Sequence, residues 1–410
     1  MKIWAFPAFY PYDHPGLKWN GIFAHRQYKA LIANGADLSV VVPVKWHPPA
    51  PFHMLDNSWK SVKKLNYPKQ TVYDGIPVYY PRIMDMKPSR VFSKPYQQRF
   101  TEGIINFFKS GNVSLEKGKD IFYAQWLPDA YCVHKAARAL GVKSAILAIG
   151  DDINVWPFKN SETLANFTEL WTEADQRFAV AGYLAQKANE TAKRTDIHCN
   201  VIRRGVEHHV FKPAEAGEKM ALRRKFGIPE DKLIIMNVGA PIRNKGWLDL
   251  IDVLSELRQS NPGIALLGVS AGYGEQNLFE VAKKHKFEDA FFNLGEIDPA
   301  EMKDVYKMAD IFCLPSKFEG IANAVVEAMS SGVATITTDV GGHPELIEHG
   351  VTGLLIQWQN RESLYNALDK MINDEEARKK IAANGRAFIV NKWGSFNSNA
   401  ASLYQKLLEM

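Results

Sequence analysis

The sequence has only three cysteines in 410 residues, Cys132, Cys199 and Cys313, and they are far apart. Their spacing fits neither a disulfide framework nor a metal site, so a reducing compartment is the simplest expectation. We expect Cys132 and Cys313, which lie in apolar segments, to be core residues. No run approaches the ~20 apolar residues of a membrane span, and the apolar start of the chain is too short for a signal peptide. These absences favour a cytoplasmic protein.

Strong charge and two common nucleotide motifs are also missing. The net charge is +5, which is too small to indicate a nucleic-acid partner, although it could favour an anionic lipid surface or acidic ligands. No G-x-G-x-x-G sequence opens the first predicted helix, and no Walker sequence occurs. Dinucleotide binding and P-loop chemistry are therefore not indicated.

What is present is the composition of a soluble globular protein, with 46% hydrophobic and 23% charged residues. The length predicts two or three domains. Strand patterns alternate with helix patterns from the start, which predicts an α/β fold. The clearest early segments are a strand over 3–6, a helix over 21–33, a strand over 38–44, a hairpin over 71–80 around Asp74-Gly75, and helices over 96–109 and 128–140.

The most informative stretch runs from 310 to 353. An apolar run over 310–314 predicts a buried parallel strand, and Phe318-Glu319-Gly320 a tight turn. A helix is expected over 322–331, followed by a strand over 333–338 and a turn at Gly341-Gly342. The turns of such a unit lie at the carboxyl ends of parallel strands, where ligands bind in open α/β sheets.

Two carboxylates in this stretch, Glu319 and Glu327, define its chemistry. Glu319 precedes the predicted helix and Glu327 lies about two turns into it, so both can edge one crevice. The backbone N–H groups of Gly320, Ile321, Ala322 and Asn323 suit a phosphate, and a carboxylate can accept two sugar hydroxyls. Together they suggest a nucleotide sugar. The alternative is a solvated helix that carries ordinary surface glutamates.

These residues resemble a known family. The spacing from Glu319 to Glu327 looks like the E-x7-E motif of family 4 retaining glycosyltransferases, and P-S-x-x-E-G, G-G-x-x-E and G-x-T-G-L-L are similar to that family. The resemblance implies the GT-B fold, with two Rossmann-like domains facing a central cleft. We expect an acceptor-binding domain over 1–205, a donor-binding domain over 206–390, and a C-terminal helix over 391–410 that packs back on the first domain.

The resemblance also implies roles for individual residues of the donor site. Glu327 would bind the ribose hydroxyls, and Glu319 would contact the hydroxyls of the donor sugar. The segment Gly320 to Asn323 would present backbone N–H groups, and Gly295 and Ile297 would line the base pocket. In the first turn of the chain, Asn20 and Gly21 would approach the donor phosphate or the acceptor.

The loop after the strand 233–238 carries two cations, Arg243 and Lys245. The family usually has an arginine at the place of Ala240, so Arg243 is the expected substitute, while Lys245 matches the family lysine. Two cations at a strand end can neutralise a diphosphate and stabilise it as it leaves. The alternative is a pair of solvated charges flanking a helix.

A second polar turn, Gly150-Asp151-Asp152, follows the strand predicted over 144–149. It resembles the acceptor-side loop of the family, so Asp151 or Asp152 could bind acceptor hydroxyls or take the proton of the attacking group. The alternative is a helix N-cap aspartate with a solvated neighbour.

The segment 45–69 interleaves aromatic residues with lysines, including Lys60, Lys63 and Lys64. Such a mixture can mark a peripheral membrane contact or an acceptor loop. The alternative, which we favour, is a surface insertion held by its own aromatic residues.

The sequence thus predicts a retaining glycosyltransferase of hexosyltransferase type that uses a nucleotide diphosphate sugar, with a UDP-sugar as the expected donor. The acceptor would be a glycan, a lipid-linked sugar or a small molecule, as in polysaccharide biosynthesis at the inner face of a membrane. No Asp-x-Asp sequence occurs, so neither a metal nor another cofactor is expected. Two alternatives remain. One is an epimerase or phosphorylase of the same fold. The other is a non-catalytic carbohydrate-binding scaffold, which is an alternative because Ala240 replaces the family arginine.

Overall fold

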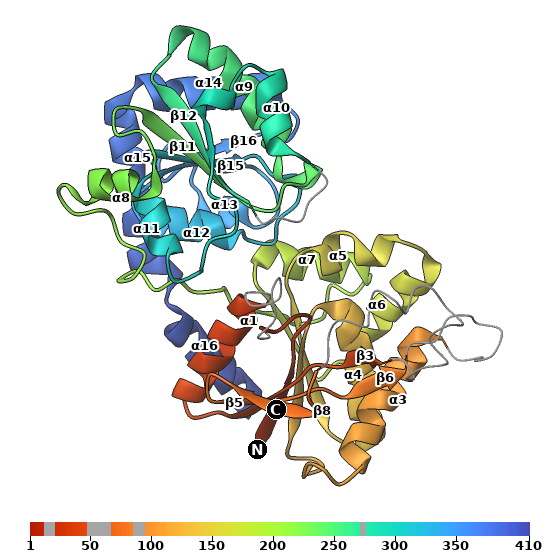
Figure 1. The fold of residues 1–410 in the computed structure, drawn as a ribbon. Helices are drawn as coiled ribbons and strands as arrows, with labels where there is room; N and C mark the ends of the chain where they lie inside the picture. Colours follow the sequence, from red (N-terminus) through yellow and green to blue (C-terminus); the bar gives the residue numbers. More distant parts are fainter. Residues whose placement is uncertain (12–20, 47–66, 85–94, 271–275) are drawn as a thin grey trace, which may run out of the picture. The chain divides into compact units, whose positions relative to one another are not determined.

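The structure is a computed structural model that describes residues 1–11, 21–46, 67–84, 95–270 and 276–410 (Figure 1). The chain divides into two compact units. The N-terminal unit comprises residues 1–180, 184–202 and 397–410, and the C-terminal unit comprises 181–183 and 203–396. Each unit has its own parallel sheet.

The N-terminal unit is built on an eight-stranded sheet with the order β10-β9-β8-β7-β1-β2-β5-β4. All neighbours pair in parallel except β4 and β5, which form the predicted hairpin around Asp74 and Gly75. The chain order reverses between β1 and β7, so the ligand-binding edge predicted for such sheets lies there. The strands are β1 Lys2–Phe6, β2 Asp37–Val41, β4 Gln70–Tyr73, β5 Ile76–Tyr79, β7 Ile121–Gln125, β8 Lys143–Ala148, β9 Gln176–Ala179 and β10 Asn200–Val201.

One strand prediction in this unit was wrong. The expected strand over 38–44 ends at Val41, and the chain then starts a separate strand, β3 (Val44–Trp46), which pairs in parallel with β6 (Arg82–Met84). The break falls at Pro43, which has no N–H group to donate to a continuing ladder.

The helices of the N-terminal unit include α16, the last helix of the chain, which starts at Phe396 and not at 391, because the turn η5 (Ile389–Trp393) and Gly394 precede it. Figure 1 shows it in blue beside the red helix α1. The amide of Asn34 donates to Asn397 Oδ1 at 2.9 Å, and the hydroxyl of Tyr404 donates to the carbonyl of Gly35 at 3.2 Å. The helices are α1 Ile22–Ala33, α3 Tyr96–Lys109, α4 Leu127–Leu140, α5 Asp151–Asn154, η2 Trp156–Phe158, α6 Ser161–Glu173, α7 Gly182–Thr191 and α16 Phe396–Leu408.

The C-terminal unit is built on a six-stranded, fully parallel sheet with the order β13-β12-β11-β14-β15-β16. This is the doubly wound order 3-2-1-4-5-6, whose chain order reverses between β11 and β14. The buried strands read as continuous apolar runs, as expected when helices cover both faces. The strands are β11 Leu233–Val238, β12 Ile264–Val269, β13 Phe291–Asn293, β14 Ile311–Leu314, β15 Ala334–Thr338 and β16 Leu354–Ile356.

Helices cover the two faces of this second sheet. In Figure 1, α9, α10 and α14 lie on one side, and α8, α11, α12 and α15 lie on the other. The helices and short turns are α8 Glu218–Phe226, η3 Arg243–Lys245, α9 Trp247–Ser260, α10 Leu278–Lys284, η4 Glu288–Ala290, α11 Met302–Lys307, α12 Asn323–Ser330, α13 His343–Leu346, α14 Arg361–Asn373, α15 Glu375–Phe388 and η5 Ile389–Trp393.

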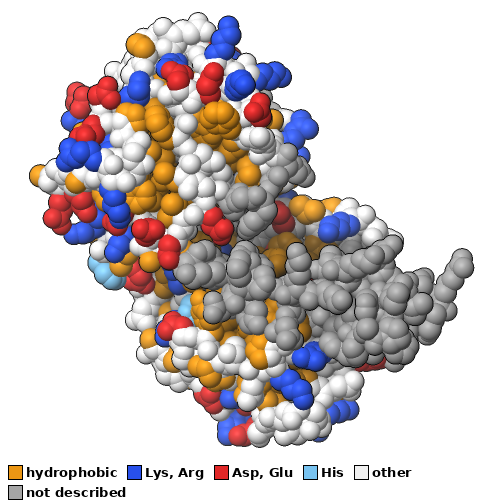
Figure 2. All heavy atoms as spheres, in the orientation of Figure 1, with side chains coloured by type: hydrophobic (Ala, Val, Ile, Leu, Met, Phe, Trp, Pro, Cys, Tyr) orange, Lys and Arg blue, Asp and Glu red, His pale blue; other side chains and the backbone are white. Residues whose placement is uncertain are grey.

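Both cores are apolar, and the visible surface is mixed in charge. Cys132 and Cys313 are buried, which confirms that prediction. On the face in Figure 2, lysine and arginine side chains are interspersed with aspartate and glutamate. Among the helices that the structure describes, none has both the length and the apolarity of a membrane span. The predicted membrane-contact residues Lys60, Lys63 and Lys64 lie outside the described residues.

Candidate active site

The reversal point of the C-terminal sheet brings two predicted site residues together. Lys245 ends the turn η3 after β11, and Glu319 lies in the turn after β14. The ammonium of Lys245 donates to Glu319 Oε1 at 2.6 Å. The Glu319 side chain is 11% exposed and that of Lys245 is 26% exposed. A charge pair therefore sits, partly exposed, at the edge where this sheet type binds ligands.

Backbone contacts hold the two loops of this pair in place. The amide of Lys317 donates to the carbonyl of Asn244 at 2.8 Å, which ties the loop after β14 to the loop after β11. Gly246 has a φ of 67°, and a Cβ there would lie 2.1 Å from the carbonyl oxygen of Pro315. Only glycine fits this close approach.

A third loop, after β15, packs against the Glu319 turn. The amide of Gly342 donates to the carbonyl of Gly320 at 2.7 Å. Gly341 has a φ of 61°, and a Cβ there would lie 1.8 Å from the carbonyl oxygen of Glu319. The two glycines thus let the loop after β15 support the turn that carries the carboxylate.

Helix α12 starts at Asn323, one residue later than predicted, with Ala322 as its N-cap. Ala322 accepts from the amides of Val325 and Val326. The preceding amides from Gly320 to Asn323 donate to no backbone group of the described residues. They remain available for an anion at the positive end of the helix.

Glu327 lies within α12 and is buried, with 8% of its surface exposed. The hydroxyl of Tyr306, at the end of α11, donates to Glu327 Oε2 at 3.0 Å. Tyr306 is itself fully buried. This tyrosine is not predictable from the sequence, because no local pattern links a residue on one helix to a carboxylate on the next.

His343 is a second residue that was not among the predicted site residues, although it lies within the G-G-x-x-E motif. Its Nδ1 lies 3.1 Å from the carbonyl of Thr338 and 3.0 Å from the Thr337 hydroxyl, which itself donates to Leu314. Nδ1 therefore carries the hydrogen, and the buried Nε2 has no partner among the described residues. Burial lowers the pKa of His343 and outweighs the opposite effect of the nearby Glu319. The lowered pKa favours the neutral ring.

The other cation of the η3 turn, Arg243, is exposed and forms no ion pair with any described residue. The structure thus pairs Lys245, not Arg243, with Glu319. Ala240, in place of the family arginine, accepts a hydrogen bond from the Trp247 indole at 3.2 Å.

The predicted base-pocket residues lie beyond β13. Gly295 has a φ of 70°, and its amide donates to Asn293 Oδ1 at 3.1 Å. Ile297 packs partly buried against the core. Both lie on the β12–β13 side of the sheet, whereas Glu319 lies on the β14 side.

In the N-terminal unit, Gly21 takes the place expected for it, after β1. It caps α1 with a φ of 77°, and a Cβ there would lie 2.1 Å from the carbonyl oxygen of Phe9. Asn20 lies outside the described residues. After the neighbouring strand β7, Trp126 has a φ of 72°, a strained conformation for a residue with a side chain.

The two aspartates after β8 differ in environment. Asp151 is exposed, whereas Asp152 is fully buried. The carboxylate of Asp152 accepts from the amides of Gly150 at 2.7 Å, Ile149 at 3.1 Å and Leu127 at 3.3 Å. Burial raises the pKa of Asp152 to about 6. Asp152 thus holds the turn together, and Asp151 is the one that faces solvent.

A family model matches the part of the chain that contains this candidate site. The model of the family described as "Glycosyl transferases group 1" matches residues 218–388, which contain Lys245, Glu319 and Glu327. Within the part of the chain that the structure describes, no three His, Cys, Asp or Glu side chains gather as a metal-binding group.

Relatives and solved structures extend the likeness over the whole chain. The chain is 25% identical to the "Putative teichuronic acid biosynthesis glycosyltransferase TuaC" of Bacillus subtilis, over 93% of this chain and 92% of that protein. It is 30% identical to the D-inositol 3-phosphate glycosyltransferase of Stackebrandtia nassauensis, over 44% of this chain and 42% of that one.

Two solved structures cover 100% of both chains at 16% identity, which shows the fold. They are the sucrose-phosphate synthase of Thermosynechococcus elongatus, with a TM-score of 0.76, and Anabaena HepE in complex with UDP and glucose, with a TM-score of 0.74. The predicted GT-B fold is confirmed. Residues 218–388, which contain the paired lysine and glutamate, are thus similar to the group 1 glycosyltransferases, and the chain as a whole has the GT-B fold.

Proposed function

We propose that this glycosyltransferase transfers a sugar from a nucleotide diphosphate sugar, with a UDP-sugar as the expected donor, and that it retains the anomeric configuration. The observation that carries the proposal is the Lys245–Glu319 pair at the sheet's reversal point, beside the available amides of Gly320 to Asn323. The ammonium and the carboxylate lie 2.6 Å apart, and groups of these two kinds suit phosphate and sugar hydroxyls.

Lys245 would stabilise the diphosphate as it leaves. An ammonium has three hydrogens, and the bond to Glu319 uses one, so two can reach phosphate oxygens. Because negative charge develops on the departing phosphate, a cation already held in position lowers the barrier most. The α12 amides add to it, and Arg243 provides a second, exposed cation nearby in sequence. In this proposal no metal ion is needed.

The two glutamates would hold the two ends of the donor. Glu319 would accept from the sugar hydroxyls, and Glu327, steadied by Tyr306, would accept from the ribose hydroxyls. Anabaena HepE was solved with UDP and glucose and with UDP-glucose, which supports a UDP-sugar donor for a protein of this fold. In the N-terminal unit, Asp151 is the proposed acceptor-side residue, because Asp152 is occupied by backbone amides.

The first test is thermal stability of the wild type and of Glu327→Ala with UDP, GDP, ADP and dTDP. A ligand at a hundredfold its dissociation constant adds roughly 2.7 kcal/mol to the free energy of unfolding. We expect one nucleotide, UDP, to raise the melting temperature of the wild type but not of the variant. No shift with any nucleotide, in protein shown to be folded, would count against the donor site.

Retention needs a separate readout. The nucleotide sugar identified in this way can be incubated with the enzyme, and the anomer first released or transferred can be read by proton NMR before mutarotation. We expect the anomer of the donor. The opposite anomer would contradict the retaining mechanism and leave the donor assignment intact.

A further inference from the structure

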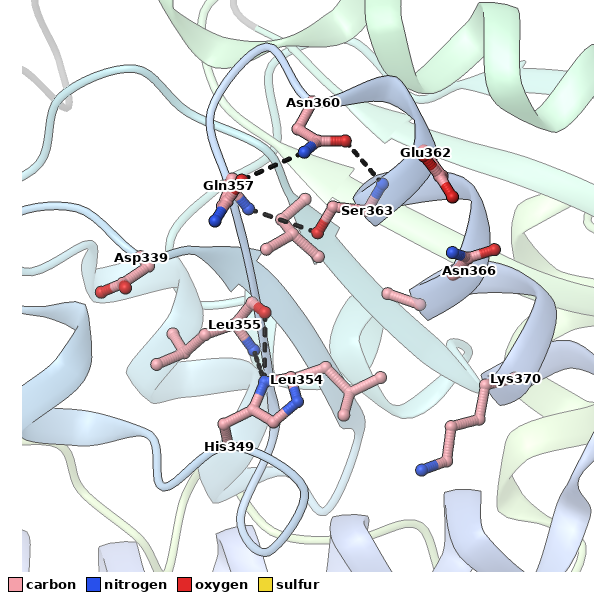
Figure 3. A pocket seen from close by; sticks show the side chains of 12 residues that line it. Asp339, His349, Leu354, Leu355, Gln357, Asn360, Glu362, Ser363, Asn366 and Lys370 are labelled. Carbon is pink, nitrogen blue, oxygen red and sulfur yellow. Dashed lines mark hydrogen bonds between the residues drawn. The ribbon is translucent and has the colours of Figure 1, made fainter.

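A groove of about 640 Å³ runs along the outer edge of β16 in the C-terminal unit (Figure 3). Helix α14 forms its other wall. Its volume is within the range of roughly 300–1,000 Å³ that is usual for ligand sites. None of Lys245, Glu319 and Glu327 lines it, so it is distinct from the donor site described above.

One end of the groove lies at the functional edge of the sheet. Asp339 follows β15, and its amide donates to the carbonyl of Ile356, the last residue of β16, at 2.7 Å. Two residues after Asp339, Gly341 contacts the Glu319 turn. Neighbouring strands are about 4.8 Å apart, so β16 lies only about 10 Å across the sheet from β14. This end of the groove therefore lies at the same edge of the sheet as the Glu319 turn.

The side chains that line the groove suit hydroxyl groups. Figure 3 shows Asp339, Glu362, Asn366 and Lys370 around it, and none of these side chains hydrogen bonds or pairs with a described residue. Carboxylates accept, an ammonium donates and an amide does both. Hydroxyl groups donate and accept as well, so a saccharide can satisfy all four.

The backbone of the edge strand argues against a peptide ligand. Nδ1 of His349 lies 3.1 Å from both the amide nitrogen and the carbonyl oxygen of Leu355. These groups point away from β15, because the next residue, Ile356, is the one whose carbonyl accepts from the β15 side. Figure 3 draws both contacts with His349. Because the imidazole covers them, an extended peptide cannot add to this edge as a further strand.

The charge of the groove argues against a polyanion. Asp339 and Glu362 contribute two negative charges and Lys370 one positive charge, so these three side chains sum to −1. We propose that this groove binds an uncharged saccharide chain. The proposal goes beyond the transfer function above, because the groove shares no residue with the proposed donor site.

The test uses an array of neutral and uronic-acid-containing oligosaccharides, probed with the wild type and with the double variant Glu362→Ala/Asn366→Ala. Both residues are exposed on α14, so the variant should fold normally. We expect the wild type to bind neutral oligosaccharides of two or more sugars, and titration calorimetry to show roughly tenfold weaker binding by the variant, as one or two hydrogen bonds are lost. Asn373→Ala, an exposed asparagine at the end of the same helix and outside the groove, is the matched control and should bind as the wild type does.

Binding only of uronic-acid chains, absence of saccharide binding, or equal affinity of the double variant would overturn the inference. The nucleotide thermal shift, measured on the same samples, separates it from the proposed function. If the nucleotide still raises the melting temperature but no saccharide binds, only the groove proposal is contradicted, and the proposed function stands. Saccharide binding retained in Glu327→Ala supports the groove, whatever the nucleotide result.

Discussion

Lys245 and Glu319 are the residues on which activity should depend most. Lys245→Ala should lower kcat by about 100-fold or more, because it removes the charge that faces the leaving diphosphate. Initial rates at saturating donor would measure this. Lys317→Ala, an exposed lysine of the adjoining loop without an ion pair to Glu319, is the control and should retain activity. Wild-type kcat in Lys245→Ala would refute the assigned role.

Tyr306 should act through Glu327. Tyr306→Phe removes one hydrogen bond, which is worth ~1 kcal/mol, so nucleotide affinity should fall about fivefold while kcat stays near its wild-type value. Calorimetric titration with the stabilising nucleotide measures the change. Tyr404→Phe removes a single tyrosine hydrogen bond in the N-terminal unit and should leave nucleotide affinity unchanged. Equal affinity in Tyr306→Phe would mean that the tyrosine does not position Glu327.

Asp152 should make stability depend on pH. The folded state takes up its proton at a pKa of about 6, whereas the unfolded chain does so near 3.8. Between these values the folded state holds the extra proton, so this contribution to stability is lost as the pH rises through 6. Relative to Asp152→Asn, the wild type should be more stable at pH 4.5 than at pH 7, by about 2 kcal/mol. Urea unfolding at both pH values tests this, and a pH-independent difference would contradict it.

At the scale of elements, the donor turn depends on the loop after β15. Gly341→Ala should destabilise the C-terminal unit and reduce activity, because its Cβ would lie 1.8 Å from the carbonyl oxygen of Glu319. Gly350→Ala has a similar φ, 79°, but open space around the Cβ, so it should cost only the backbone strain of ~1 kcal/mol. Thermal unfolding and activity of the two variants separate crowding from strain. Equal effects of the two substitutions would show that the contact with Glu319 is unimportant.

The elements also show where sequence patterns suffice. Helix α3 has the bounds predicted, because its apolar periodicity and flanking residues are local signals. Helix α6 was missed, although Asn160 and Thr163 form a capping box at its start that could have revealed it. The prediction of one strand over 38–44 is wrong because Pro43 has no N–H group to continue the ladder.

For the molecule as a whole, the last helix belongs to the N-terminal unit although the chain reaches it from the C-terminal unit. Leu403 on α16 is fully buried, so Leu403→Ala should cost about 2–5 kcal/mol. Leu408→Ala, at a 49% exposed position of the same helix, should cost much less. Calorimetric unfolding should show the loss in the transition of the N-terminal unit. Similar melting profiles for the two variants would mean that α16 contributes little to that core.

The sequence by itself determined the α/β class, the family resemblance and the chemistry of Glu319, Glu327 and Lys245, since these depend on local pattern and residue type. Only the tertiary structure decided that Lys245, 74 residues away along the chain, pairs with Glu319 and that Arg243 does not. It also decided that Tyr306 supports Glu327, and that Asp152 holds a turn while Asp151 faces solvent. The physical reason is that strand order and loop packing set such contacts, and neither is recorded in local sequence.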